Sequence, residues 1–239
     1  MRVLFLNLWH GKLQEPLSIF LDKQKNVDVF CFQEADRFDE ENIFPDWLGE
    51  YSRVATAKQA GEKSSFSLIT FVHPRFRILA TEELLQGNEE EGLALAVQLD
   101  MTEGRGVGIV NIHGTARARV DGVWLESDAK QDFPARLNQS QIIIDFAKDQ
   151  TVPIIFGGDF NVLPETKTIE MFRQAGYRDL IQEFRIQTTR NHYAWDCYPD
   201  GPMYFYSDYV LTHPEIKVKR FEVQSVEISD HLPLFLEIE

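Results

Sequence analysis

Short apolar runs recur along the whole chain, and several of them end directly at a polar side chain. Each run has the length of a strand, is either apolar throughout or alternating, and is bounded by glycine, proline or acidic turns. This pattern predicts β-strands. The predicted strands are Arg2–Leu6, Asp28–Phe32, Ser65–Val72, Phe76–Ala80, Leu93–Leu99, Val107–Ile112, Pro153–Phe156, Tyr209–Leu211, Lys217–Gln224 and Pro233–Ile238.

Three other segments have their apolar residues at helical spacing. They are Leu13–Lys25, Ala135–Lys148 and a segment near Thr166–Ala175, and Pro134 suits the first turn of the second helix. No internal repeat is visible, and no linker rich in Pro, Gly and Ser divides the chain. We therefore expect residues 1–239 to form a single α+β domain.

The charge of the chain disfavours one class of partner. The 24 Lys and Arg residues stand against 38 Asp and Glu residues, so the formal net charge is −14. Proteins that wrap duplex nucleic acid usually carry a basic face, because phosphate neutralisation supplies most of their non-specific affinity. A DNA scaffold is therefore disfavoured. Nucleic acid remains a candidate substrate for an enzyme that uses metal ions to neutralise it locally, and no feature indicates an obligate protein partner.

The apolar and cysteine content favours a cytoplasmic protein. The apolar start of the chain is too short for the core of a signal peptide, and no run approaches the roughly 20 apolar residues of a membrane span. Cys31 and Cys197 cannot form a disulfide framework or a paired-cysteine metal motif. We expect no membrane span and a reducing, cytoplasmic setting.

The polar residues that follow the predicted strands are the candidates for chemistry, because a rigid strand aims such a side chain while the loop leaves it open. Each has a structural alternative: Glu34 could form a salt bridge, Asn7 could close a turn, and His113 could pack in the core. The motifs are Asn7-Leu8-Trp9, Gln33-Glu34, Asn111-Ile112-His113, Gly157-Gly158-Asp159-Phe160-Asn161, Ser207-Asp208-Tyr209 and Ser229-Asp230-His231.

Two of these motifs suggest a particular chemistry. A plain turn does not need the two glycines before Asp159, which permit close backbone approach. Asp208 and His231 begin two different strands, and a carboxylate bonded to an imidazole fixes its tautomer and favours imidazolium. That form suits a developing negative charge.

A converging set of carboxylates would suit a metal ion. If Glu34, Asp159 and Asp230 meet, a hard cation such as Mg²⁺ is the natural occupant, because its ligands are oxygens. Zinc would prefer cysteines or clustered histidines, and the sequence has no such cluster at ligand spacing.

Taken in order, the six motifs resemble those of the endonuclease/exonuclease/phosphatase superfamily. That superfamily includes deoxyribonuclease I, exonuclease III-type abasic endonucleases, inositol polyphosphate 5-phosphatases and neutral sphingomyelinases. The resemblance extends from residue 7 to residue 231, and six motifs in the same order are far more specific than any one of them. It implies a four-layer α/β sandwich, in which two mainly antiparallel sheets pack face to face with helices outside.

The resemblance also implies roles at the metal and at the attacking water. Glu34 would be the principal Mg²⁺ ligand, with Asn7 and Asp230 at the same site and Mn²⁺ as a substitute ion. Asp159 would orient or deprotonate the attacking water. Asn161 would help it and would also contact the phosphate.

The remaining matched residues would act on the phosphoryl group. His113 and His231 would stabilise its pentavalent transition state, and Asp208 would hold His231. Phosphoryl transfer needs mainly positioning and charge stabilisation, so these amide, carboxylate and imidazole groups suffice.

Two long segments without a predicted element are candidates for substrate contact. Gly114–Arg136 has four basic and four acidic residues, and its end resembles the loop and helix start of some bacterial members. There Arg136 could bind an anion at a helix N-terminus, or it could be a solvated helix residue. Tyr193–Tyr209 holds five of the seven tyrosines. Its Trp195 could stack on a base, line an apolar leaving-group site or pack over the core.

The leading hypothesis is a divalent-metal-dependent phosphoesterase that hydrolyses a phosphodiester or phosphomonoester with an activated water. A nuclease and a phosphatase for a small molecule or a lipid head group both remain open. The alternative from another class is a catalytically inactive family member that serves as a binding module. The presence of Glu34, Asp159 and His231 counts against it.

Overall fold

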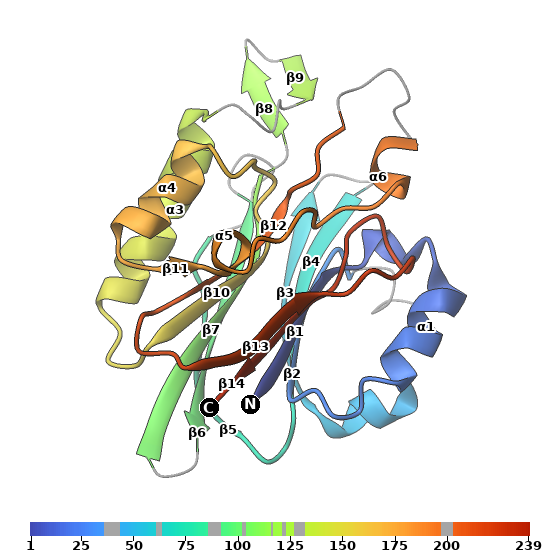
Figure 1. Cartoon of the computed structure of the whole chain (residues 1–239), viewed down its shortest axis with the longest axis vertical. Helices are drawn as coiled ribbons and strands as arrows, with labels where there is room; N and C mark the ends of the chain where they lie inside the picture. The colour runs from blue at the N-terminus through green and yellow to red at the C-terminus, as the bar shows by residue number, and fades with distance from the viewer. Residues whose placement is uncertain are drawn as a thin grey trace.

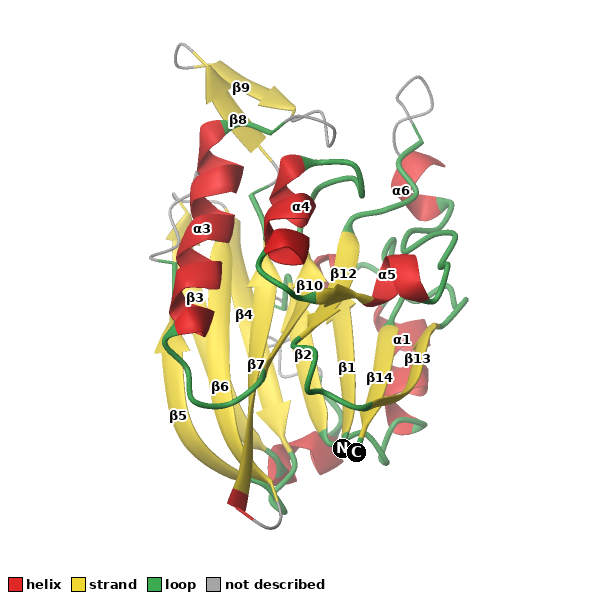
Figure 2. Cartoon of the chain, turned by 60° about the vertical axis from the view of Figure 1, so that its left-hand side comes forward, coloured by secondary structure: helices red, strands yellow, loops and turns green. Residues whose placement is uncertain are grey.

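The fold is a sandwich of two six-stranded β-sheets with helices on both outer faces (Figure 1, Figure 2). The computed structural model describes residues 1–35, 44–60, 64–85, 92–101, 104–115, 117–120, 123–126, 132–196 and 203–239. The layer order of helix, sheet, sheet and helix confirms the predicted four-layer α/β sandwich.

The first sheet contains strands from both ends of the chain, in the order β13-β14-β1-β2-β4-β3. Strands β1 and β2 are parallel, and the other neighbouring strands are antiparallel. The bounds are β1 Arg2–Asn7, β2 Val29–Gln33, β3 Ser52–Ala60, β4 Ser64–Val72, β13 Val218–Val223 and β14 Leu234–Ile238.

Strand β1 is buried on both faces, which explains its uninterrupted apolar sequence. Successive side chains of a strand point to opposite faces. Val3 and Phe5 therefore enter the core between the sheets, while Leu4 and Leu6 enter a second cluster with the apolar face of α1 (Gln14–Asp22). The N-terminal strand thus joins three of the four layers.

The second sheet has the order β11-β12-β10-β7-β6-β5, and β7 and β10 are its one parallel pair. Helices α3 (Pro134–Lys148) and α4 (Lys167–Gln174) lie together on its outer face (Figure 2). The strand bounds are β5 Arg77–Glu83, β6 Leu93–Met101, β7 Arg105–His113, β10 Ile154–Asp159, β11 Arg178–Asp179 and β12 Asp208–Thr212.

Short elements complete the described part of the chain. The hairpin of β8 and β9 projects beyond the sheets at one end of the molecule, and α6 lies toward the same end, apart from the hairpin (Figure 1, Figure 2). The bounds are β8 Arg117–Val120, β9 Val123–Glu126, α5 Leu180–Glu183, α6 Tyr193–Asp196, and the 3₁₀ helices η1 Trp9–Gly11 and η2 Asp46–Glu50.

Several elements differ from the sequence prediction. The segment Gly114–Arg136 contains the β8–β9 hairpin, and Tyr193–Tyr209 contains α6, although neither was expected to have regular structure. Strand β3 was missed because its small and polar residues lack a clear apolar face, as an edge strand allows. Lys130 of the first segment and Cys197 of the second lie outside the described residues.

The longest helix in the described ranges, α3, has 15 residues. None of the helices described there combines the length and the apolar character needed to cross a membrane.

Strand β10 continues to Asp159, beyond the predicted end at Phe156. The added part of the strand contains Gly157 and Gly158. Glycine is needed at both positions because neighbouring atoms leave no room for a Cβ. A Cβ on Gly157 would lie 2.4 Å from a ring carbon of Phe5 in the facing sheet. Gly158 has φ +129°, and its Cβ would lie 2.2 Å from the carbonyl oxygen of Ile112 on the adjacent strand and 3.0 Å from Nε2 of Gln33 in the facing sheet. The glycines therefore let the two sheets approach directly below the candidate site.

This close approach predicts the effect of a single methyl group. Gly157→Ala should lower the free energy of unfolding by about 1–3 kcal/mol, because the buried Phe5 ring must move to admit the new Cβ. Gly49→Ala is the matched control, since a Cβ there meets no atom within 4 Å. Urea unfolding measures both variants, and equal stability for the two would contradict the packing argument.

Candidate active site

The site lies at one edge of the sandwich, where four strands end and a fifth begins. The parallel pair β1 and β2 ends with Asn7 paired to Gln33, and the parallel pair β7 and β10 ends with His113 paired to Asp159. Parallel strands end at the same edge of a sheet, and the antiparallel β12 begins there with Asp208 opposite Asp159. This edge faces the side on which the hairpin and α6 project (Figure 1).

A buried hydrogen bond aligns the two sheets just behind this edge. The Gln33 side-chain amide donates to Asn111 Oδ1 at 2.6 Å, and Asn111 Nδ2 donates to the carbonyl oxygen of Phe32 at 3.1 Å. Gln33 belongs to the first sheet and Asn111 to the second, and both are fully buried. These polar residues of the predicted motifs therefore fix the relative position of the sheets.

Asn7 joins two carboxylates from different sheets. Its Nδ2 donates to Glu34 Oε1 at 3.1 Å and to Asp159 Oδ2 at 3.0 Å, while its Oδ1 accepts the Trp9 N–H at 2.9 Å. Asn7 is completely buried. It thus closes a turn, as its structural alternative foresaw, and also forms part of the cluster.

Backbone strain accompanies the cluster. Among the described residues, five non-glycine residues have positive φ, and four of them belong to the loops around the site. These four are Trp9, His10, Glu34 and Asn161, with φ between 50° and 56°. Such conformations cost free energy and tend to gather at functional sites. At Glu34 this backbone turn follows the end of β2, where the carboxylate lies against the Asn7 amide.

Two imidazoles lie against Glu34. His10 Nε2 is 3.1 Å from Glu34 Oε2, and His113 Nε2 is 3.6 Å from Glu34 Oε1. His10 was missed by the sequence analysis, because only the left-handed backbone of Trp9 and His10 brings it here. Its one sequence signal was its position three residues after Asn7.

Asp159 is buried and held on both of its oxygens. Its Oδ1 accepts hydrogen bonds from the Ser207 hydroxyl and from the Asn161 N–H, the latter at 2.9 Å. Burial alone would raise the pKa of Asp159, but the positive charges of His231 and His113 outweigh it, and the pKa is lowered. Asp159 is therefore ionised at neutral pH and can accept a proton or orient water.

Asp208 and His231 form the predicted pair. His231 Nδ1 lies 2.9 Å from Asp208 Oδ2, and both residues are buried. Burial and Arg190 would lower the pKa of His231, but Asp208, Asp230 and Asp159 overcome them and raise it to about 9. Burial raises the pKa of Asp208 to about 6. At neutral pH the pair is an imidazolium and a carboxylate.

Asp230 is paired with an arginine. Arg190 Nη2 donates to Asp230 Oδ2 at 2.6 Å. Asp230 Oδ1 is 3.8 Å from His231 Nε2. Sequence analysis missed Arg190 because it follows no predicted strand. Its neighbour Thr189 accepts the backbone N–H groups of Ser207 and Asp208, which ties this loop to the site.

Two groups of described residues have the chemistry to hold a metal ion. Glu34, His113 and Asp159 form one group, in which one ligand atom of each residue lies within 4.8 Å of the others. Asp159, Asp208 and His231 form the second. In the first group, Glu34 and Asp159 both accept hydrogen bonds from the Asn7 amide. Their carboxylate oxygens suit a hard divalent cation. Asp230, expected at the ion, belongs to neither group.

The two residues expected to contact substrate differ in their surroundings. Arg136 is buried rather than solvated: its Nε donates to the Thr115 carbonyl oxygen at 3.2 Å, and its guanidinium lies 4.4 Å from the Phe133 ring centroid. Trp195 of α6 is half-buried and contacts Phe205, with ring centroids 5.5 Å apart.

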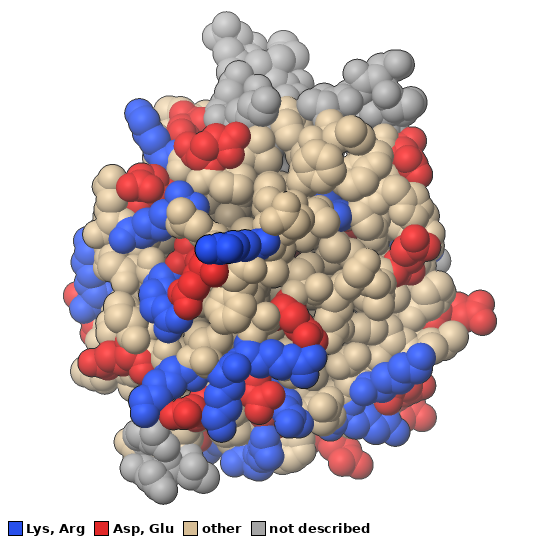
Figure 3. All heavy atoms as spheres, viewed as in Figure 1, with Lys and Arg blue, Asp and Glu red and all other residues tan. Residues whose placement is uncertain are grey.

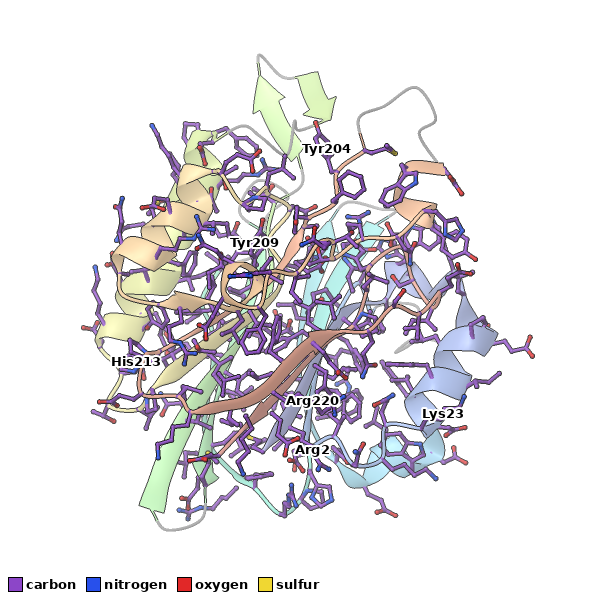
Figure 4. The ribbon with its side chains drawn as sticks, viewed as in Figure 1. Arg2, Lys23, Tyr204, Tyr209, His213 and Arg220 are labelled. Carbon is purple, nitrogen blue, oxygen red and sulfur yellow. The ribbon has the colours of Figure 1, made fainter. Side chains whose placement is uncertain are left out.

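Aromatic side chains from the loops border the same edge. Trp9 and Tyr193 have ring centroids 5.9 Å apart, and Phe205 is 43% exposed. Figure 4 places Tyr204 at this rim and the fully buried Tyr209 below it. The aromatic part of Tyr193–Tyr209 thus splits between a rim and the core.

A sequence model of the Endonuclease/Exonuclease/phosphatase family matches residues 5–231. The match covers most of the chain, and the chain belongs to this family. Proteins of this family are hydrolases that act on phosphoester bonds. No curated protein matches the chain.

Solved structures share the fold at low sequence identity. The human Nocturnin catalytic domain with bound sulfate anion is 16% identical, with a TM-score of 0.74 over 100% of this chain and 94% of that one. The Bacteroides thetaiotaomicron mannosyl-6-phosphatase Bt3783 is 16% identical, with a TM-score of 0.72 over 100% and 99%. D. rerio TDP2 complexed with single strand DNA product is 12% identical, with a TM-score of 0.68 over 100% and 98%.

The Asp208–His231 pair predicts a pH effect. Asp208→Asn should lower the pKa of His231 from about 9, because it removes a negative charge that favours imidazolium while burial still opposes it. The rate at neutral pH should fall roughly 10²- to 10⁴-fold, and the basic limb of the pH–rate profile should move to lower pH. Nitrogen NMR of the histidine rings measures the pKa directly.

Asp145→Asn is the control for this titration, because Asp145 is exposed and its carboxylate pairs with Lys148. It should leave the pKa of His231 unchanged. The pairing would be refuted by a His231 pKa that is the same in Asp208→Asn as in the unaltered protein.

Proposed function

We propose that the chain is a Mg²⁺-dependent phosphoesterase that attacks a phosphoryl group with a water held by Asp159. The observation that carries this proposal is the Asn7 amide between Glu34 and Asp159. Two carboxylates held this close repel each other unless a cation or a proton compensates them. A divalent ion bound by both carboxylates would compensate their charge without a rearrangement of the fold.

Glu34 would hold the ion, with Asp159 and Asn7 beside it. When bound, a divalent ion stabilises charge on phosphoryl oxygens and lowers the pKa of a bound water. The ligand atoms favour Mg²⁺, with Mn²⁺ as its substitute, because Glu34 and Asp159 offer carboxylate oxygens and the described residues place no cysteine near them. Asp230 was expected at the ion as well, and its Arg190 contact is taken up below.

The side chains of the chain perform the remaining steps. Asp159 is ionised, and its Oδ1 is fixed by two donors, so it can orient water and accept its proton. Asn161 lies at the start of the next loop, where its Nδ2 donates to the Gly114 carbonyl oxygen at 2.9 Å and retains a second hydrogen for a phosphoryl oxygen. His113 and His231 flank Asp159 at 3.8 and 3.6 Å, where donors on the imidazole rings would stabilise the negative transition state.

The charge of the surface favours small or single-stranded substrates over a long duplex. The formal net charge of the chain is −14, and on the face shown in Figure 3 the described Lys and Arg side chains gather mainly in the lower part, mixed with acidic ones. A duplex-binding groove would need a basic rim. Solved structures of similar fold include a mannosyl-6-phosphatase and a protein with single strand DNA product, and both classes remain candidates here.

A substrate panel tests this proposal. It should contain plasmid DNA, abasic DNA, RNA, inositol phosphates, sphingomyelin and bis-p-nitrophenyl phosphate, each assayed with Mg²⁺ and with EDTA. We expect hydrolysis of at least one class that EDTA abolishes. A folded, metal-binding protein that is inactive on the whole panel would support the alternative of a binding module.

We also propose a cytoplasmic location, which is supported by the cysteine content. The chain has two cysteines, and Cys31 is a free thiol that is completely buried within β2.

The assignment of Glu34 predicts a change in metal dependence. Glu34→Gln keeps the shape of the side chain but removes its charge, so the affinity for Mg²⁺ should fall by roughly 10-fold or more. Glu215→Gln is the control, because the Glu215 side chain is 76% exposed. Mg²⁺ titration of activity and Mn²⁺ binding by electron paramagnetic resonance measure both. If Glu34→Gln binds the metal ion as well as the unaltered protein does, Glu34 is not a metal ligand.

The aromatic rim predicts a separation of binding from stability. Trp195→Ala should raise KM roughly 10-fold, since stacking on an aromatic ring contributes about 1–3 kcal/mol per base, and should change Tm little. Trp47→Ala should do the reverse, because Trp47 packs on the buried Phe30. If Trp195→Ala lowers Tm and leaves KM unchanged, Trp195 belongs to the core instead.

A further inference from the structure

Arg190 is a guanidinium within the site to which no role has yet been assigned. Its backbone forms an isolated bridge with His231, so the residue is held beside the imidazole. Thr188 and Thr189 fix the loop on its N-terminal side through hydrogen bonds to Phe205, Ser207 and Asp208. The Arg190 side chain is 18% exposed, so only a small part of it is accessible to solvent.

The guanidinium uses few of its donors. It carries five N–H groups, and its hydrogen bond within the described residues runs from Nη2 to Asp230 Oδ2 at 2.6 Å. Its Nε is buried and has no hydrogen-bond partner in the described ranges. Buried polar groups normally have partners. The buried Nε is closed to a ligand in this conformation, so the Nη hydrogens that Asp230 leaves unused are the donors that an anionic ligand at a phosphoester site would engage.

Arg190 also lies within electrostatic range of the reacting groups. Its charge lowers the pKa values of Asp159, Asp208 and His231. Asp208 has His231 as its cationic partner, and Asp230 has Arg190. The arginine is therefore placed among the residues that face the phosphoryl group in the proposed reaction.

We propose that Arg190 binds an oxygen of the substrate's phosphoryl group with the donors that Asp230 leaves unused, and that Asp230 holds the guanidinium in place. This inference rests on the proposed phosphoesterase function. The planar fork of arginine matches phosphate oxygens and is already oriented by the carboxylate. Asp230 is then a positioning residue that acts through Arg190, and it is not a ligand of the metal ion.

Binding measurements without turnover test this assignment in the full chain. Calorimetry with inorganic phosphate at saturating Mg²⁺ reports the anion, and Mn²⁺ electron paramagnetic resonance without phosphate reports the metal. Arg190→Gln should weaken phosphate binding roughly 10- to 100-fold, the range of a charge-assisted hydrogen bond, without weakening Mn²⁺ binding. Arg190→Lys should recover part of the loss, because it restores the charge but not the fork.

Asp230→Asn separates the two roles of the carboxylate. It should weaken phosphate binding, because it loosens the guanidinium, and should leave the Mn²⁺ affinity within twofold of the unaltered protein. Arg185→Gln is the control for loss of a cation, since Arg185 is exposed on the same stretch of chain. It should bind both phosphate and Mn²⁺ like the unaltered protein.

The variant Arg190→Gln leaves Asp230 without its cationic partner and can lose stability for that reason. The double variant Arg190→Gln with Asp230→Asn removes both charges, and it should show the same loss of phosphate binding as Arg190→Gln alone. Phosphate affinity within twofold of the unaltered protein in the double variant would overturn the proposal. So would a tenfold loss of Mn²⁺ affinity in Asp230→Asn with unchanged phosphate binding, which would make Asp230 a metal ligand.

The experiments distinguish an error in the proposed phosphoesterase function from an error in the role of Arg190. A protein that binds phosphate through Arg190 but hydrolyses nothing in the substrate panel would refute the phosphoesterase and support the arginine assignment. An unaltered protein that binds Mn²⁺ but not millimolar phosphate would count against the arginine.

Discussion

One side-chain amide holds the two halves of the site together. Asn7 ends the N-terminal strand of the first sheet, and its Nδ2 donates both to Glu34 of the same sheet and to Asp159 of the other. This contact works only because the sheets are close and aligned. The glycines of β10 permit the approach, and the Gln33–Asn111 hydrogen bond fixes the alignment. The core packing of the sandwich therefore determines the distance between two carboxylates of the candidate site.

The charges of the site follow from this arrangement. Four carboxylates of the described residues lie at the edge, and two of them have a cationic partner: Asp208 is paired with His231, and Asp230 with Arg190. Glu34 and Asp159 share the Asn7 amide and face imidazole nitrogens at 3.1 to 3.8 Å. A divalent cation at these two groups would balance their charge. The same positive groups would then face the phosphoryl group of a substrate.

Much of this could be predicted from the sequence, because strand length and strand ends are local properties. The apolar runs identified most strands, and most of the residues after them lie close together, although Asp230 pairs with Arg190 and joins neither group that could hold a metal ion. Contacts that depend on distant packing could not be predicted. Asn7 and Asp159 are 152 positions apart, and their hydrogen bond depends on the register between sheets. The left-handed turn that brings His10 to Glu34 has no local signal, and Arg190 reaches Asp230 across 40 positions from a loop without strand pattern.

The most direct test of the account is the position of a bound metal ion. A crystal soaked with Mn²⁺ and measured near the manganese absorption edge should show an anomalous peak within coordination distance of both Glu34 and Asp159, beside the Asn7 side chain. That result would show that the shared amide marks the metal site of this fold. A crystal with Mn²⁺ bound elsewhere, or with no peak at this pair while the protein hydrolyses its substrate, would contradict the account.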